Sequence, residues 1–181
     1  MTKPTEQLMK EHRLIEKILE VLAALANDAE QGTGPDPARA RDTLTFFREF
    51  ADRCHHGKEE RHLFPRLAEH GYGPQMGPVA VMLSEHDQGR AYLRAVGEAL
   101  ENLDAPGTRA RFAQAARGYV ELLKGHIYKE DNILFRLADS CFTDEDQRTV
   151  AEGFDAVETE EMGAGAHERF HAMAEELIKT L

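Results

Sequence analysis

Apolar residues recur every three or four positions along most of this chain, which is the spacing of one face of an α-helix. Clusters of Gly, Pro and short polar residues interrupt the pattern at 32–37, 71–78, 104–107 and 143–146. The long amphipathic segments between these clusters predict long helices joined by short connections. The expected fold is all-α, and short connections favour an up-down-up-down four-helix bundle.

The first two helices occupy the segments before and after the Gly-Pro cluster at 32–37. The first is predicted over Thr5–Asp28. The second begins after Asp36, an N-cap residue followed by Pro37 at the first helical position, and ends near His70. Pro65 falls inside this second span and predicts a kink or an early end, because proline removes a backbone hydrogen bond.

The third helix is predicted over Pro78–Leu103 and the fourth over Thr108–Asp139, with Thr108 as its N-cap. Thr143 and Asp146 resemble the capping signal of a shorter fifth helix near 145–160.

The glycines at 163–165 should end the fifth helix, and a last amphipathic segment covers 166–180. We therefore expect a bundle over residues 1–140 and a C-terminal helical extension over 141–181 that packs on it.

Charge and cysteine content narrow the function. The 181-residue chain has a net charge of −11 with its acids spread throughout, which argues against nucleic-acid and anionic-membrane surfaces. It has no bilayer-length apolar run and no apolar signal-peptide core near its first residue. Cys54 and Cys141 do not suggest a disulfide framework, so the cytoplasm is the expected compartment.

Each predicted long helix carries a histidine within its apolar stripe, and two of them add a glutamate one turn later. Buried polar groups without partners cost roughly 1–3 kcal/mol each, so a bound metal is the simplest explanation. The predicted ligands are His12, His56, Glu60, His86, His126 and Glu130.

An internal repeat supports this choice of ligands. His56, Glu60 and the Arg-Leu-Ala that begins at Arg66 match His126, Glu130 and the Arg-Leu-Ala of 136–138 at a constant shift of 70. Glu11-His12 matches Glu85-His86 at a shift of 74. The bundle is therefore expected to consist of two similar helical hairpins.

Other polar residues are expected to have less direct roles at the metal site. His55 and Glu59 are predicted to lie off the His56 face, solvated or supporting a ligand. Glu16 follows His12 by one turn and is a possible additional ligand. His70 is expected at a helix end, whereas His167 and His171 are expected on the surface or in packing of the last helix.

The pattern H…H-x3-E…H…H-x3-E resembles the hemerythrin-like (HHE cation-binding) family. The segments EHRLIEKILEVL, HHGKEERHLFPRL, SEHDQGRAYL and HIYKEDNILFRLA carry it, over roughly residues 5–140. The resemblance implies a four-helix bundle with two non-haem irons under an oxo or hydroxo bridge. It makes the four histidines terminal ligands and makes Glu60 and Glu130 bridging carboxylates.

One position departs from oxygen-carrying hemerythrin, in which a second histidine follows the third-helix histidine by one turn. Here that position is Arg90, which leaves the four-histidine, two-glutamate set of the iron-centre-repair proteins. Arg90 is expected to pair with Glu16 or a bridging glutamate. Glu11 and Glu85 directly precede ligand histidines and are expected to orient imidazoles or relay protons.

Imidazole and carboxylate ligands suit iron, with manganese or zinc as alternatives. The leading hypothesis is a protein that binds or senses oxygen or nitric oxide, or handles iron under oxidative or nitrosative stress. The alternative is a di-iron enzyme that reduces peroxide or nitric oxide. A ferritin-like oxidase and a metal-free interaction module rank lower. The sequence does not determine the oligomeric state.

Overall fold

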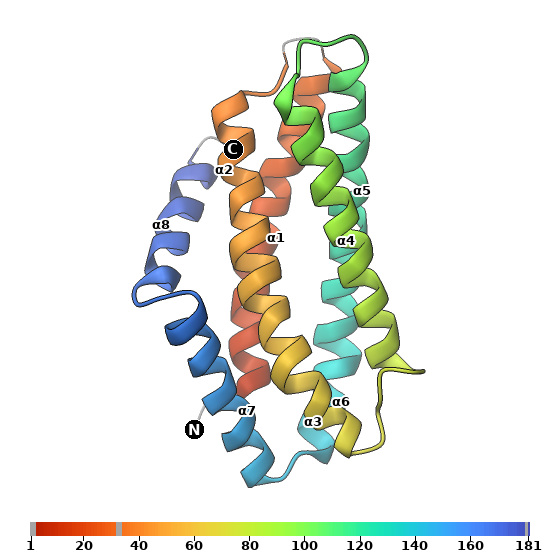
Figure 1. The fold of residues 1–181 in the computed structure, drawn as a ribbon, viewed down its shortest axis with the longest axis vertical. Helices are drawn as coiled ribbons and strands as arrows, with labels where there is room; N and C mark the ends of the chain where they lie inside the picture. Colours follow the sequence, from red (N-terminus) through yellow and green to blue (C-terminus); the bar gives the residue numbers. More distant parts are fainter. Residues whose placement is uncertain (1–2, 32–33, 180) are drawn as a thin grey trace.

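The computed structural model describes residues 3–31, 34–179 and 181, and all regular structure in these ranges is helical. Positions 32–33 of a predicted turn, and 180 at the predicted end of the last helix, lie outside them. Figure 1 shows the long helical segments side by side along the longest axis of the molecule. Within the described residues, no helix is both long and apolar enough to cross a bilayer.

The first helix begins one residue before its predicted start, and the second rod begins directly after its predicted N-cap. Helix α1 covers Pro4–Glu30. The second rod consists of α2 (Pro37–Phe46), the π-helical η1 (Phe47–His56) and η2 (Glu59–Leu63), and α3 (Phe64–Glu69). Asp36 caps this rod, since its side chain accepts hydrogen bonds from the backbone of Ala38 and Arg39 at 2.9 and 3.3 Å.

Pro65 does not end the second rod early, contrary to one of the two predicted outcomes. It occupies the second position of α3, directly after the π-helical η2. A π-helix forms i→i+5 hydrogen bonds, and the missing amide of proline falls where that pattern returns to the α pattern. The rod continues to His70 at its C-cap, as predicted, and Gly71 follows with φ of 92°.

The third rod is α4 (Pro78–Glu101), and the fourth consists of α5 (Thr108–Lys129), η3 (Glu130–Leu134) and α6 (Phe135–Cys141). The prediction that Thr108 is an N-cap is wrong. Gly107 is the N-cap with φ of 77°, a conformation that glycine adopts readily, and Thr108 is the first helical residue.

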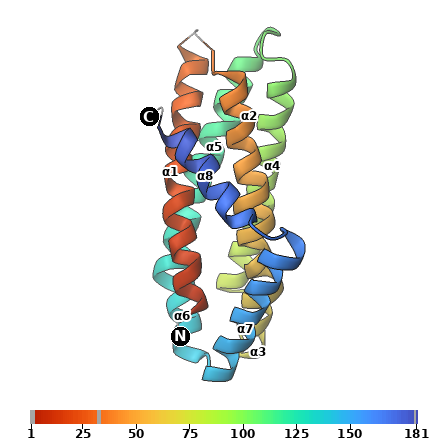
Figure 2. The ribbon, with the colours of Figure 1, turned by 90° about the vertical axis from the view of Figure 1, so that its left-hand side faces the viewer.

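Three further segments follow: α7 (Asp144–Ala156), the π-helical η4 (Val157–Glu161) and α8 (Ala166–Ile178). The predicted cap is confirmed, because Thr143 and Asp146 form a reciprocal capping box. Helix α7 contacts η2 and α1, and α8 contacts α1 and α2. Figure 2 shows α8 crossing in front of α1 and α2.

The core consists of two apolar clusters that share no residue. One includes Ile15, Leu93 and Ile127, and the other includes Leu8, Met82 and Leu134. On α1, α4 and the fourth rod, buried polar residues lie in the sequence between the members of these clusters. The fold thus encloses a polar layer between two apolar ones.

Close packing of α4 on α5 depends on Gly118. A Cβ atom at this position would lie 2.4 Å from the ring of Tyr92. We expect Gly118→Ala to lower the free energy of unfolding by about 1–3 kcal/mol, the usual cost of overpacking. Urea denaturation measures this, and Gly125→Ala, where nothing lies within 4 Å of the added atom, is the matched control.

Candidate metal centre

Seven buried histidine and glutamate side chains converge in the polar layer. Their potential ligand atoms form two groups within which all atoms lie within 4.8 Å of one another, and Glu59 belongs to both. The first group contains His12, His55, Glu59 and Glu130, and the second contains His56, Glu59, His86 and His126. All seven residues are at most 4% exposed.

The two carboxylates span the two groups. Glu59 lies 3.6 Å from His55 Nε2 through Oε1 and 3.5 Å from His86 Nε2 through Oε2. Glu130 Oε2 lies 3.2 Å from His12 Nε2 and 3.3 Å from His126 Nε2. Each acid therefore faces one histidine from each group, so each could contribute oxygens to ions held by both groups.

The carboxylate groups of Glu59 and Glu130 would be stabilised by bound cations. All four oxygens of Glu59 and Glu130 are buried without a hydrogen-bond partner. Burial and the charge of Glu130 raise the pKa of Glu59 well above its usual range. Two unpartnered carboxylates side by side are costly in an interior, and metal ions remove that cost.

Four of the five histidines point their Nε2 atoms inward in pairs. His12 and His55 place these atoms 2.9 Å apart, and His86 and His126 place them 3.2 Å apart. Two nitrogens that bind one ion at about 2.1 Å and at right angles are roughly 3.0 Å apart. Burial lowers the pKa of His55 to about 4 and that of His86 to about 3, whereas the facing acids outweigh burial and raise the pKa of His12 and that of His126, the latter to about 9.

Each inward histidine is held from behind by an acid on its Nδ1 atom. His12 donates to Asp131 and His86 to Glu60, both at 2.7 Å. His55 contacts Glu11 at 2.8 Å, His126 contacts Glu85 at 3.0 Å and His56 contacts Asp52 at 3.3 Å. Such partners fix the ring orientation and tautomer of a ligand histidine.

These contacts reveal two structurally equivalent halves. In the first half, Glu11 contacts His55 and Lys58, and the ring of His12 stacks on Phe135. In the second half, Glu85 contacts His126 and Lys129, and the ring of His86 stacks on Phe64. His56 is the exception, because its counterpart is the apolar Ile127.

The equivalence fixes the internal repeat at a shift of 71 rather than the predicted 70. His55, Lys58, Glu59, Leu63 and Phe64 match His126, Lys129, Glu130, Leu134 and Phe135 at this shift. Pro65 is a one-residue insertion, so only the Arg-Leu-Ala after it returns to a shift of 70. The longer match was present in the sequence and identifies His55 and Glu59.

The structure therefore brings together five of the six predicted ligands, but not Glu60. Glu60 is half-buried and accepts hydrogen bonds from His86 Nδ1 and from Arg90. The prediction that His55 and Glu59 lie off the His56 face is wrong, since both are buried in the polar layer. The π-turns of η1 and η2 are the physical reason, because they widen the turn and place His55, His56 and Glu59 on one side.

The remaining candidates have clear positions. Arg90 pairs with Asp52 and with Glu60. Glu60 is one of the glutamates that were predicted as its partner. Glu16 is partly buried, pairs with Arg13 at 3.2 Å and belongs to neither group. Glu11 and Glu85 contact His55 and His126 rather than the histidines that follow them in sequence.

The peripheral histidines and the cysteines agree with their predictions. His70 is a helix C-cap that contacts Asp146 at 3.0 Å. His167 and His171 lie near the ring of Phe50 in the packing of α8. Cys54 and Cys141 are unpaired thiols.

Several known proteins are similar in sequence to this chain. An uncharacterized protein of Mycobacterium tuberculosis is 27% identical over 165 residues, covering 87% of this chain and 62% of its own length. An uncharacterized protein of Mycobacterium bovis matches to the same extent. The iron-sulfur cluster repair protein YtfE of Escherichia coli is 38% identical over 86 residues, covering 45% of this chain and 39% of its own length.

This chain thus spans about three fifths of the mycobacterial relatives and less than half of the repair protein. A sequence model described as the hemerythrin HHE cation-binding domain matches residues 3–138, which carry all seven converging side chains. The chain belongs to the hemerythrin HHE cation-binding family.

Proposed function

We propose that the seven converging side chains hold two iron ions, and that this pair binds or senses oxygen or nitric oxide, or handles iron under oxidative or nitrosative stress. The observation that carries the proposal is the pair of buried carboxylates, whose four oxygens have no hydrogen-bond partner and face histidines from both groups. Nitrogen and oxygen donors of this kind suit iron, with manganese or zinc as alternatives.

The two positions differ in their donors. His12 and His55 supply two imidazoles on one side, whereas His56, His86 and His126 supply three on the other. The proposed centre therefore uses five histidines in place of the four that the sequence predicted, because it includes His55. With one imidazole fewer, the side of His12 and His55 would leave a coordination position open to a small diatomic molecule. Bound iron would supply the redox chemistry and the affinity for that molecule.

The polypeptide would hold and isolate the ions. The acids behind each imidazole keep it oriented, and the apolar clusters on both sides keep bulk water away from the centre. Arg90 neutralises Glu60 and Asp52, so that neither carboxylate competes with Glu59 for an ion.

We also propose that residues 1–140 work as an up-down-up-down four-helix bundle and that 141–181 is an extension on it. The four rods each deliver at least one side chain to the centre, and the family match ends at residue 138. The unpaired thiols of Cys54 and Cys141 favour the reducing cytoplasm as the compartment of this protein.

Metal analysis of protein purified without oxygen tests the proposal. We expect about two irons per chain, as two bridging carboxylates require, and an absorption change on exposure to oxygen or nitric oxide. A persistent adduct in stopped-flow spectra would support binding, and rapid return with product release would indicate turnover instead. A chain that takes up no iron from anaerobic ferrous solution would contradict the proposal.

A further inference from the structure

Lys58 is a buried cation beside the metal centre, although lysine is rarely buried without partners. Its side chain is 0% exposed, and its Nζ contacts Glu11 Oε1 at 2.5 Å and also contacts Glu158. The ring of Phe154 lies 5.8 Å from the same Nζ. Phe154 and Glu158, two residues of the C-terminal helices, thus enclose the ammonium group of Lys58.

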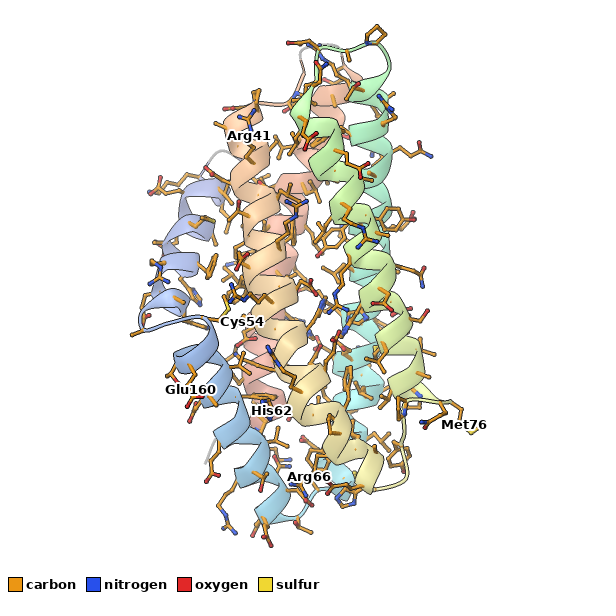
Figure 3. All side chains as sticks on the ribbon, in the orientation of Figure 1. Arg41, Cys54, His62, Arg66, Met76 and Glu160 are labelled. Carbon is orange, nitrogen blue, oxygen red and sulfur yellow. The ribbon has the colours of Figure 1, made fainter. Side chains whose placement is uncertain are left out.

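The contacts form a continuous chain from the C-terminal helices to the centre. Glu158 binds Lys58, Lys58 binds Glu11, and Glu11 holds His55 Nδ1 at 2.8 Å. Gln7 Nε2 donates to Glu158 Oε1 at 2.8 Å and fixes its position. Figure 3 shows Cys54 on the second rod and Glu160 on η4 where these two elements approach each other.

The second half of the centre has an equivalent histidine, glutamate and lysine, but among the described residues it has no counterpart of Glu158. Lys129 contacts Glu85, which holds His126. Lys129 is 35% exposed, and among the described residues it has one acidic partner, Glu85. The two halves therefore match in His, Glu and Lys but differ by one carboxylate, which the C-terminal helices supply.

Glu11, Glu158 and His167 also lie close enough together to resemble a cation site. The ammonium of Lys58 already binds both of those carboxylates, so we assign no metal to this group of three residues.

We propose that Glu158 is a positioning residue of the metal centre, which acts through Lys58 and Glu11 to hold His55 in the group that also contains His12. This rests on the proposed function. Because Glu158 shares the charge of Lys58, Glu11 keeps more of its negative charge for His55, which makes that imidazole a stronger donor. Without Glu158, Lys58 would draw Glu11 away from His55.

The test compares Glu158→Gln with Glu160→Gln in the iron-loaded full chain. Mössbauer spectra and the rate of iron removal by a chelator are the readouts. We expect Glu158→Gln to shift the doublet of one iron only and to speed loss of that iron roughly tenfold, the lower range for such supporting partners. Glu160 is exposed on the same segment, so its variant should match the wild type.

Unchanged spectra and rates in Glu158→Gln, with two irons bound, would overturn the inference and leave the proposed function intact. A wild type without iron would contradict the proposed function itself. If Glu158→Gln does not fold, Gln7→Met replaces it, because it removes the donor that fixes Glu158. A shift of one doublet in that variant supports the inference, and an unchanged doublet overturns it.

Discussion

Glu59→Gln is expected to abolish binding of the metal pair while it stabilises the metal-free chain. Glu59 is the one residue in both ligand groups, so the amide removes a charged donor from both ions. The same side chain is a fully buried acid without a hydrogen-bond partner, and its replacement by a neutral amide of similar shape should raise the free energy of unfolding by about 1–3 kcal/mol. Metal analysis and urea denaturation measure the two effects.

Glu60→Gln is the matched control, because Glu60 is the neighbouring acid and lies outside both groups. We expect it to retain the metal, with at most a modest loss of stability from its contacts with His86 and Arg90. If Glu60→Gln lost the metal and Glu59→Gln kept it, the arrangement around η2 would be incorrect.

The stabilisation by Glu59→Gln should depend on pH in a defined direction. The pKa of Glu59 in the folded chain is raised well above the usual 4.5, first by burial and then by the charge of Glu130. A raised pKa stabilises the fold below the unfolded pKa, and this contribution is lost as pH rises towards the folded value. The advantage of the metal-free variant over the metal-free wild type should therefore grow as the pH rises above about 4.5. An equal difference at pH 5 and pH 8 would contradict this.

His55→Ala should release one iron and His56→Ala should release the other. His55 shares a group with His12, whereas His56 belongs with His86 and His126. Supporting partners alone change metal affinity about 10–100-fold, so loss of a direct ligand should exceed that range. Iron content per chain and Mössbauer spectra of each variant distinguish the two ions.

His171→Ala is the control for this pair, because His171 is exposed on α8 and belongs to neither group. It should retain both irons. Full iron content in His55→Ala would show that the five-histidine arrangement does not describe the bound centre.

Much of this protein could be predicted from its sequence. Hydrophobic spacing, Asp36 with Pro37, and the Thr143–Asp146 cap determine where helices form, because these are local effects. The histidines at positions 12, 86 and 126 and Glu130 could be placed for a related reason. Each lies on an apolar stripe, and a polar side chain there needs a partner.

The tertiary structure decided the ligands of the second rod. A regular α-helix turns by a constant angle, so the sequence pattern placed His56 and Glu60 inward and their neighbours outward. The π-turns in η1, η2 and η3 change that angle, which brings Glu59 inward and leaves Ile133 55% exposed while Leu134 is buried. Local propensity does not specify a π-turn, and packing of the rods around the polar layer selects it.

The contacts that join distant segments also required the tertiary structure. Glu11 and Glu85 support histidines on other helices rather than their own sequence neighbours. Glu158 reaches Lys58 across 100 positions of sequence. Helical periodicity assigns a residue to a face of its own helix, but the partner across that face depends on how the helices pack, and only the folded chain determines it.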